Sequence, residues 1–289
     1  VAARFSGPAD PRILEIIEHN KPLAIRFPGG TVANWYNWRT DSQWAPDYDS
    51  WTKEMKEKRG HFKEQEGVVK FGFLDYAKVI QKYKIEPILV FAPAYDTPQE
   101  CAERLKHGMS HGVRPKWVEL GNELGYHLQR SGKVTTVESY LAVSKEITKA
   151  LKAVDPQVKI ALNTENLNND FQEDNEWSAG LAKEAFYDGM VIHPYLKLPA
   201  DYQNNRGGMR ELFGAYGVTM NVLQKCHALY HKPILASEWG VMVRYSNKWV
   251  SSFLDVIGNA EIFMAFLKAW QEGKVAHATI HMYALNGYG

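Results

Sequence analysis

Two glutamates in the sequence stand where short apolar runs give way to loops. Glu123 follows KWVELGN at 116–122, and Glu238 follows KPILAS at 232–237. Two carboxylates that face each other can break a glycosidic bond, because one protonates the leaving oxygen while the other attacks the anomeric carbon. The alternative is that one or both glutamates are surface residues of a loop.

A further carboxylate precedes Glu123 in the same run. Side chains alternate along a strand, so Glu119 shares a face with Glu123 and lies about two pleats deeper. A carboxylate in a protein interior needs a partner, and Arg26, in the run LAIRF, is the candidate. We expect a structural ion pair between Arg26 and Glu119. We also expect Arg26 to lie near Glu238 and to favour its charged form.

The elements that must position these residues follow an alternating pattern of short apolar runs and helical periodicity. The runs lie at 23–27, 86–92, 116–122, 159–165, 189–195, 232–239 and 277–283. The helical patterns lie at 10–20, 73–84, 98–108, 137–154, 178–187, 209–230 and 260–272. Strands that alternate with helices predict parallel βαβ units, and continuous apolar strands predict burial on both faces.

The predicted fold class is α/β, as a (β/α)8 TIM barrel that forms a single catalytic domain over residues 1–289. A barrel of this kind takes roughly 250 residues, and the chain has 289. Seven strands are clear, so the eighth must come first, and VAARFSG at 1–7 is the candidate for its end. The sequence also stops soon after the last run. We therefore expect a barrel that is trimmed at the first strand and at the last helix.

A long aromatic-rich loop at about 28–70 follows the first of the clear strands. Its large rings are those of Trp35, Tyr36, Trp38, Trp44, Tyr48 and Trp51. A connection of that length is usually functional or has structure of its own. On a barrel it would lie at the face that carries the active site. Two interpretations stay open, namely an aromatic wall beside a sugar cleft and a small subdomain that packs its own core.

Composition excludes several classes of protein. A net charge of +1 gives no electrostatic footprint for nucleic acid, and no apolar run is long enough for a membrane span. Cys101 and Cys226, in separate helical patterns, form neither a disulfide framework nor a metal cluster. The first residues do not have the layout of a signal peptide. We expect an extracellular or periplasmic protein whose signal has been removed, with a cytoplasmic one as the alternative. The sequence does not predict the oligomeric state.

The segments GNE at 121–123 and SEWG at 237–240 resemble clan A of the glycoside hydrolases. WVELGNE and RFPGG are similar to segments of the α-L-arabinofuranosidase, heparanase/β-glucuronidase and agarase-like groups. These are retaining enzymes on (β/α)8 barrels, with the acid/base glutamate on the fourth strand and the nucleophile on the seventh. Glu123 and Glu238 occupy those strands here if 1–7 contributes the first.

The resemblance implies a role for each matching residue. Glu123 would be the acid/base, Glu238 the nucleophile, Asn122 a hydrogen-bond partner of the sugar 2-hydroxyl, and Arg26 the residue that orients Glu238. Further substrate-binding residues would be Trp35, His193, Tyr195, Trp239, His281 and Tyr283. The implied partner is a carbohydrate, and neither a metal ion nor an organic cofactor is implied.

Several alternatives remain beside a retaining enzyme that cleaves a poly- or oligosaccharide. One is an exo-acting glycosidase such as an arabinofuranosidase, and another is a non-catalytic carbohydrate-binding barrel. An aldolase or isomerase is disfavoured because no lysine ends a predicted strand. His107 and His111 are interpreted as a surface pair on a loop rather than a zinc site, since no third ligand is near. Glu165 is interpreted as a subsite residue or, in preference, as a loop cap.

Overall fold

The computed structural model describes residues 11–44, 48–60, 63, 67–68, 71–164, 176–202, 204, 206–243 and 253–280. Its main sheet has seven strands in the order β1-β5-β6-β7-β8-β10-β12, and all of its pairings are parallel. The strands are β1 Ala24–Phe27, β5 Glu86–Phe91, β6 Trp117–Leu120, β7 Lys159–Asn163, β8 Gly189–Ile192, β10 Ile234–Ala236 and β12 Val275–Ala278. The prediction of seven parallel strands is confirmed, although β12 lies earlier in the chain than the predicted 277–283.

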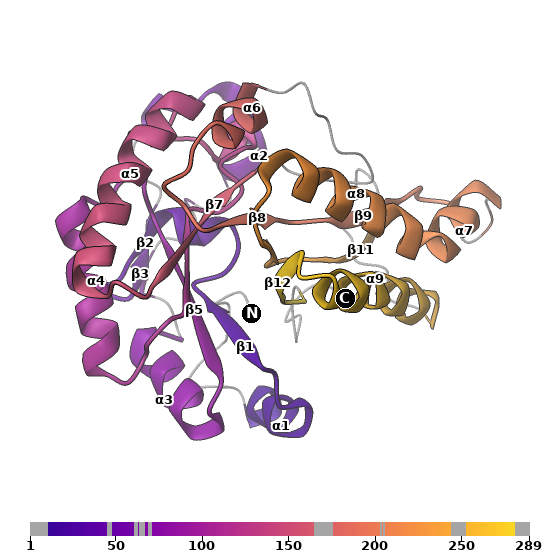
Figure 1. The fold of residues 1–289 in the computed structure, drawn as a ribbon, viewed down its shortest axis with the longest axis horizontal. Helices are drawn as coiled ribbons and strands as arrows, with labels where there is room; N and C mark the ends of the chain where they lie inside the picture. The colour runs from indigo at the N-terminus through magenta and orange to yellow at the C-terminus, as the bar shows by residue number, and fades with distance from the viewer. Residues whose placement is uncertain are drawn as a thin grey trace.

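Helices cover the outer face of this curved sheet (Figure 1). They are α3 Phe73–Tyr83, α4 Pro98–Ser110, α5 Val137–Val154, α6 Glu176–Ala182, α8 Ala215–Tyr230 and α9 Phe253–Gln271. The capping box of Thr97 with Glu100 fixes the start of α4, and that of Thr136 with Ser139 fixes the start of α5. The α/β architecture inferred from alternating patterns is therefore present.

Two helical predictions differ from the structure. The pattern at 209–230 forms two helices, α7 Arg206–Phe213 and α8, with Gly214 between them. The helix predicted at 98–108 continues through Gly108 to Ser110, so His107 is helical and His111 is the residue that follows the helix. The prediction of a loop was therefore wrong for His107, because a single glycine does not end a helix whose other face is buried, whereas His111 does lie in a turn. Helix α1 Pro11–Asn20 precedes β1.

The inner face of the sheet carries a small apolar layer. Trp117, Ala161, Val191 and Leu235 form one buried cluster that is separate from the larger core between sheet and helices. Because side chains alternate along β6, Glu119 lies on the same face as Trp117 and one layer closer to the carboxyl ends of the strands. That layer therefore forms the floor beneath the polar residues described below.

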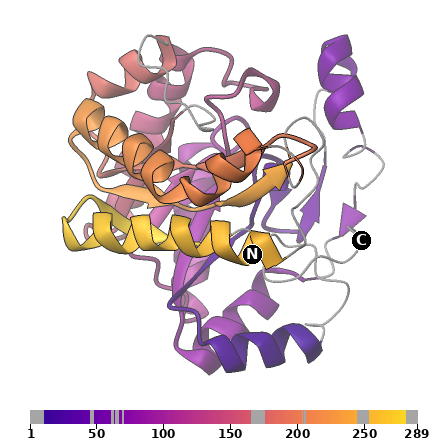
Figure 2. The same cartoon turned by 90° about the vertical axis from the view of Figure 1, so that its right-hand side faces the viewer.

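The aromatic segment has secondary structure of its own. It contains η1 Thr31–Trp35, β2 Tyr36–Asn37, β3 Ser42–Gln43, η2 Tyr48–Ser50, α2 Lys53–Arg59 and β4 Gly67–Val68. Strands β2, β3 and β4 form a three-stranded antiparallel sheet, and α2 is the violet helix at the upper right of Figure 2. Val32, Trp35 and Trp51 form a buried cluster within the segment. The described part of this loop is thus a small subdomain with a core.

Strands β1 and β12 form the two edges of the seven-stranded sheet. The first strand expected from 1–7 lies outside the described residues, as does the end of the predicted run at 277–283, from 281 on. A second, two-stranded parallel sheet pairs β9 Tyr195–Leu198 with β11 Gly240–Val243, each of which directly follows a strand of the main sheet. Within the described part of the chain, every helix is too short or too polar to cross a membrane.

Candidate active site

A tight turn at the end of β6 presents Glu123. Gly121 has φ of 89° and Glu123 has φ of 50°, so both backbones are in the left-handed region. Gly121 is required there, because a Cβ at this position would overlap the side chain of Leu124. A glutamate in this region is strained by about 1–2 kcal/mol, and such strain is common at functional sites.

Glu238 follows β10, and three other segments hold its carboxylate. Oxygen Oε1 accepts hydrogen bonds from Arg26 Nη1 at 2.8 Å and from the backbone N–H of Gly30 at 3.0 Å. Oxygen Oε2 accepts one from the hydroxyl of Tyr195 at 2.8 Å. Gly30 has φ of 65°, which L-residues rarely adopt, so the glycine allows its N–H to point at Glu238. This environment favours the ionised carboxylate.

Arg26 is fully buried and connects three residues of the site. Its Nε donates to Glu119 at 2.7 Å, its Nη1 to Glu238, and its Nη2 to the Oδ1 of Asn122 at 2.9 Å. Burial acts to lower the pKa of Arg26, but the charges of Glu119 and Glu238 outweigh it and the pKa is raised. The expected ion pair of Arg26 with Glu119 is present.

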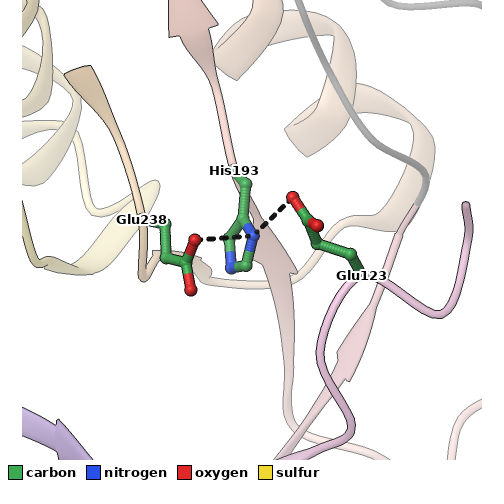
Figure 3. Close-up of side chains that lie close together, drawn as sticks. All are labelled: Glu123, His193 and Glu238. Atoms are coloured by element: carbon green, nitrogen blue, oxygen red, sulfur yellow. Dashed lines mark hydrogen bonds and ion pairs between the residues drawn. The ribbon is translucent and has the colours of Figure 1, made fainter. Parts of the chain in front are cut away.

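His193 lies between the two catalytic candidates (Figure 3). Its Nδ1 is 3.2 Å from Glu123 Oε1 and 3.7 Å from Glu238 Oε2. Its Nε2 is 3.1 Å from the Oγ of Ser237. Burial acts to lower the pKa of His193, yet the carboxylates of Glu238 and Glu123 raise it above its usual value. Burial and Glu238 raise the pKa of Tyr195 well above its usual value, so its hydroxyl keeps its proton and can donate.

The side chains of Glu123, His193 and Glu238 are also close enough together to bind a metal ion. Ligand atoms of Glu123, His193 and Glu238 all lie within 4.8 Å of one another. Both oxygens of Glu238 already accept hydrogen bonds, however, and the guanidinium of Arg26 would repel a cation beside it. The arrangement therefore suits a pair of catalytic carboxylates better than a metal centre.

Comparison with known proteins gives a likeness in fold. No protein-family profile matches the chain, and no curated protein matches its sequence. Among solved structures, it is similar to a family 51 arabinofuranosidase from Xanthomonas axonopodis pv. citri, with 15% identity over 94% of this chain and 59% of that one, at a TM-score of 0.68. A family 51 α-L-arabinofuranosidase from Bifidobacterium longum gives 13% identity over 96% and 62%, with a TM-score of 0.70.

A second group of similar structures consists of proteins that are named for a different enzymatic activity. A family 44 xyloglucanase from Paenibacillus polymyxa is 10% identical over 91% of this chain and 70% of that one, with a TM-score of 0.59. The chain shares its fold with glycoside hydrolases. The resemblance to that group of enzymes noted in the sequence is thus confirmed at the level of fold. The chain spans only 59% to 62% of the length of the two arabinofuranosidases named above.

The structure brings six of the residues predicted from the sequence together and separates two others from them. The connected cluster described above consists of Arg26, Asn122, Glu123, His193, Tyr195 and Glu238.

Trp35 is 1% exposed and packs on Trp51 within the aromatic subdomain, so the prediction that its ring binds substrate is not supported by its position. Trp239 is 5% exposed and packs edge-to-face on Phe266 of α9. Alternation turns Trp239 outward where Glu238 faces inward. His281, Tyr283 and Glu165 lie outside the described residues.

Several residues of the cluster were missed in the sequence. Asn34 accepts from the N–H of Asn122 at 2.8 Å and donates to its carbonyl at 2.9 Å. Gln129 donates to Glu123 Oε2 at 3.1 Å and to the hydroxyl of Thr31 at 2.9 Å. Lys197, on the face of β9 that carries Tyr195, has a pKa lowered by burial and partly restored by the charge of Glu123. No local pattern in the sequence marks Asn34, Gln129 or Lys197. Ser237 could have been considered, because it stands directly before Glu238.

Proposed function

We propose that this chain is the catalytic module of a retaining glycoside hydrolase that acts on a poly- or oligosaccharide. The observation that carries the proposal is the distance between the two carboxylates. One carboxylate oxygen of Glu123 lies within 4.8 Å of one carboxylate oxygen of Glu238. Retaining enzymes place their carboxyl groups ~5–5.5 Å apart, whereas inverting enzymes need roughly 6.5–9.5 Å for a water molecule.

In the proposed mechanism, Glu238 attacks the anomeric carbon and Glu123 protonates the leaving oxygen. Arg26, Gly30 and Tyr195 hold Glu238 as an oriented carboxylate, which a nucleophile needs. After the leaving group departs, Glu123 removes a proton from water, and the water hydrolyses the glycosyl-enzyme. The side chain of Glu123 is 14% exposed, so it is the more accessible of the two acids, as exchange with a leaving group and water requires.

Asn122 is suited to hold the sugar beside the reacting carbon. Its Oδ1 accepts from Arg26, whereas its buried Nδ2 has no hydrogen-bond partner among the described residues. A buried donor without a partner costs about 1–3 kcal/mol, which a sugar hydroxyl would recover. In the enzymes that the sequence resembles, the residue at the position of Asn122 contacts the sugar 2-hydroxyl.

The proposal extends to the fold and the extent of the domain. A (β/α)8 barrel over 1–289, with its first strand in 1–7, would close the sheet between β12 and β1. The likeness to arabinofuranosidases and to a xyloglucanase supports both an exo-acting and an endo-acting candidate.

We propose a secreted protein, as expected from the substrate class.

The test is hydrolysis of a panel of arabinofuranosides, xyloglucan and other polysaccharides, with Glu238→Ala and Glu123→Ala. Each variant should lose about 100-fold or more in kcat, and an activated aryl glycoside should partly restore the first step in Glu123→Ala, because a good leaving group needs no proton. Glu146→Ala, an exposed change on α5, is the matched control. Proton NMR of the first product should show retention of the anomeric configuration. Full turnover in either variant, or an inverted product, would contradict the assignment.

A non-catalytic carbohydrate-binding barrel predicts another result. Such a protein would bind glycans at this site with no hydrolysis across the whole panel, and Glu123→Ala would leave the affinity nearly unchanged. Isothermal titration with the same oligosaccharides separates the two functions.

A further inference from the structure

We propose that His193 and Glu123 share the proton that the reaction transfers, and that Ser237 and Glu119 determine which nitrogen of His193 takes part. This inference rests on the proposed function, in which Glu123 is the acid/base. It assigns His193 the role of a positioning residue that acts through Glu123, and it assigns a role to two residues below the mouth of the site.

The argument begins with the single proton of the Ser237 hydroxyl. Its Oγ lies 3.2 Å from Glu119 Oε2 and 3.1 Å from His193 Nε2. Glu119 is paired with Arg26 and is a carboxylate, which can only accept. Ser237 must therefore donate to Glu119, and its remaining lone pairs can only accept a hydrogen bond from His193. It follows that Nε2 of His193 carries a proton in both charge states of the ring.

The other nitrogen of His193 is then the one that titrates. Nδ1 is 3.2 Å from Glu123 Oε1, while the more distant Glu238 Oε2 already accepts from Tyr195. A proton that leaves Nδ1 for Oε1 breaks one N–H bond and forms one O–H bond, and the nitrogen keeps the electron pair. His193 becomes neutral and Glu123 becomes the acid that faces the leaving oxygen.

A chain of amides keeps the second oxygen of Glu123 facing a donor. The backbone N–H and C=O of Asn122 fix the orientation of the Asn34 amide. The Nδ2 of Asn34 then faces Gln129 Oε1 at 3.4 Å, so Gln129 Nε2 points at Glu123 Oε2 at 3.1 Å. With donors on both oxygens, the carboxylate form of Glu123 is favoured before substrate binds. The proton then rests on His193.

The surrounding charges favour retention of the shared proton. The carboxylates of Glu238 after β10 and Glu123 after β6 favour the protonated ring, and Arg26 of β1 opposes its positive charge. Glu119 of β6 is linked to the ring through Ser237. Lys197 of β9 acts on Glu123, and Tyr195 stays protonated. If the proton were lost, three carboxylates would face the one guanidinium of Arg26 within this part of the described chain. The raised pKa of His193 agrees with this balance.

The first test reads the protonation of His193 in the unmodified protein. Histidine labelled with 15N in the full chain reports the protonation of each ring nitrogen, and His193→Gln assigns its signals. We expect Nε2 to stay protonated throughout, while Nδ1 titrates with a pKa above the ordinary value of about 6.5. A neutral ring with its proton on Nδ1 would overturn the inference.

The second test removes the hydroxyl that fixes the ring. In Ser237→Ala the pKa of His193 should fall by about 0.5–1 unit, as expected for the loss of one hydrogen bond. The basic limb of the kcat/KM profile should move to lower pH by a similar amount, because activity is lost as pH rises through the pKa of the pair. KM should change little, and Ser237→Thr should restore both values.

Ser144→Ala on α5, a buried serine outside the site, is the matched control and should leave the titration unchanged. A wild-type titration curve in Ser237→Ala would refute the role of Ser237 and Glu119 in fixing the proton on His193 Nε2. The NMR readout does not depend on turnover. An inactive protein with the expected His193 titration therefore contradicts the proposed function alone, and an active one with the other nitrogen titrating contradicts this inference alone.

Discussion

At the scale of single residues, Glu238 shows how much of its chemistry comes from distant parts of the chain. Arg26 lies 212 positions away in sequence, Gly30 lies 208 away, and Tyr195 lies 43 away. Each supplies a donor, so both oxygens of the carboxylate are fixed before any sugar binds. In the proposed role of nucleophile, a carboxylate fixed in this way needs little reorganisation in the transition state.

Tyr195→Phe tests this arrangement directly. The change removes only the hydroxyl that donates to Glu238 Oε2 at 2.8 Å. A hydrogen bond to a charged group contributes about 1.5–3 kcal/mol, so kcat should fall roughly 10- to 100-fold with a smaller change in KM. Steady-state kinetics on the best substrate of the panel provide the measurement.

The matched control for this prediction is Tyr187→Phe. Tyr187 is also buried, and its hydroxyl donates to the carbonyl of Leu181, away from the site. Its kcat should equal that of the unmodified chain. A rise in KM alone in Tyr195→Phe would show that the hydroxyl binds the sugar and does not orient the nucleophile.

At the scale of elements, the short helix η1 fastens the aromatic subdomain to the end of β6. Asn34 of η1 bonds both the N–H and the C=O of Asn122, which lies directly before Glu123. These two backbone groups are at a left-handed turn and cannot join the sheet ladder. The subdomain therefore holds the turn that presents Glu123, the proposed acid/base, and the described Trp35 and Trp51 rings contribute by stabilising the subdomain core.

Asn34→Ala should destabilise the chain and reduce its activity together. The change leaves two buried backbone groups of Asn122 without partners, each costing about 1–3 kcal/mol. It also frees Gln129 to turn away from Glu123. Denaturant unfolding and kcat are the measurements. Asn37→Ala is the control, because the only hydrogen bond of the Asn37 side chain among the described residues is from the exposed N–H of Arg39. Equal stability of the two variants would contradict the fastening role.

At the scale of the whole molecule, the apolar layer inside the sheet carries the polar cluster. Trp117, Ala161, Val191 and Leu235 fill the interior below Glu119. A Cβ on Gly189 would lie 2.7 Å from the ring of Trp117. The ring therefore packs directly against the backbone of β8 at Gly189. Strands β6, β7, β8 and β10 thus meet around one side chain, and their ends converge at the site.

Trp117→Ala should lower the free energy of unfolding by about 3–5 kcal/mol, because it leaves a cavity at the centre of the sheet. Trp270→Ala on α9 is the control, since that ring is 62% exposed and its loss should change stability by less than about 0.5 kcal/mol. Denaturant titration followed by far-UV circular dichroism measures both. Similar losses in the two variants would show that the inner layer does not stabilise the fold.

The sequence alone determined the seven strands, their parallel arrangement and the position of Glu123 and Glu238 at two strand ends. These features follow from local apolar periodicity and from the rule that parallel strands end at one edge. It also identified Arg26 as the partner of Glu119, because a carboxylate on an inward face has few candidates for an ion pair.

Only the tertiary structure decided which further side chains surround those glutamates. Ser237, Gln129 and Asn34 entered the site because strand order and register placed them within hydrogen-bond distance of residues up to 118 positions away. The same folding turned Trp35 and Trp239 away from the cluster and into apolar packing. Local patterns give the direction of a side chain along its own strand, whereas its partners depend on how distant strands are packed together.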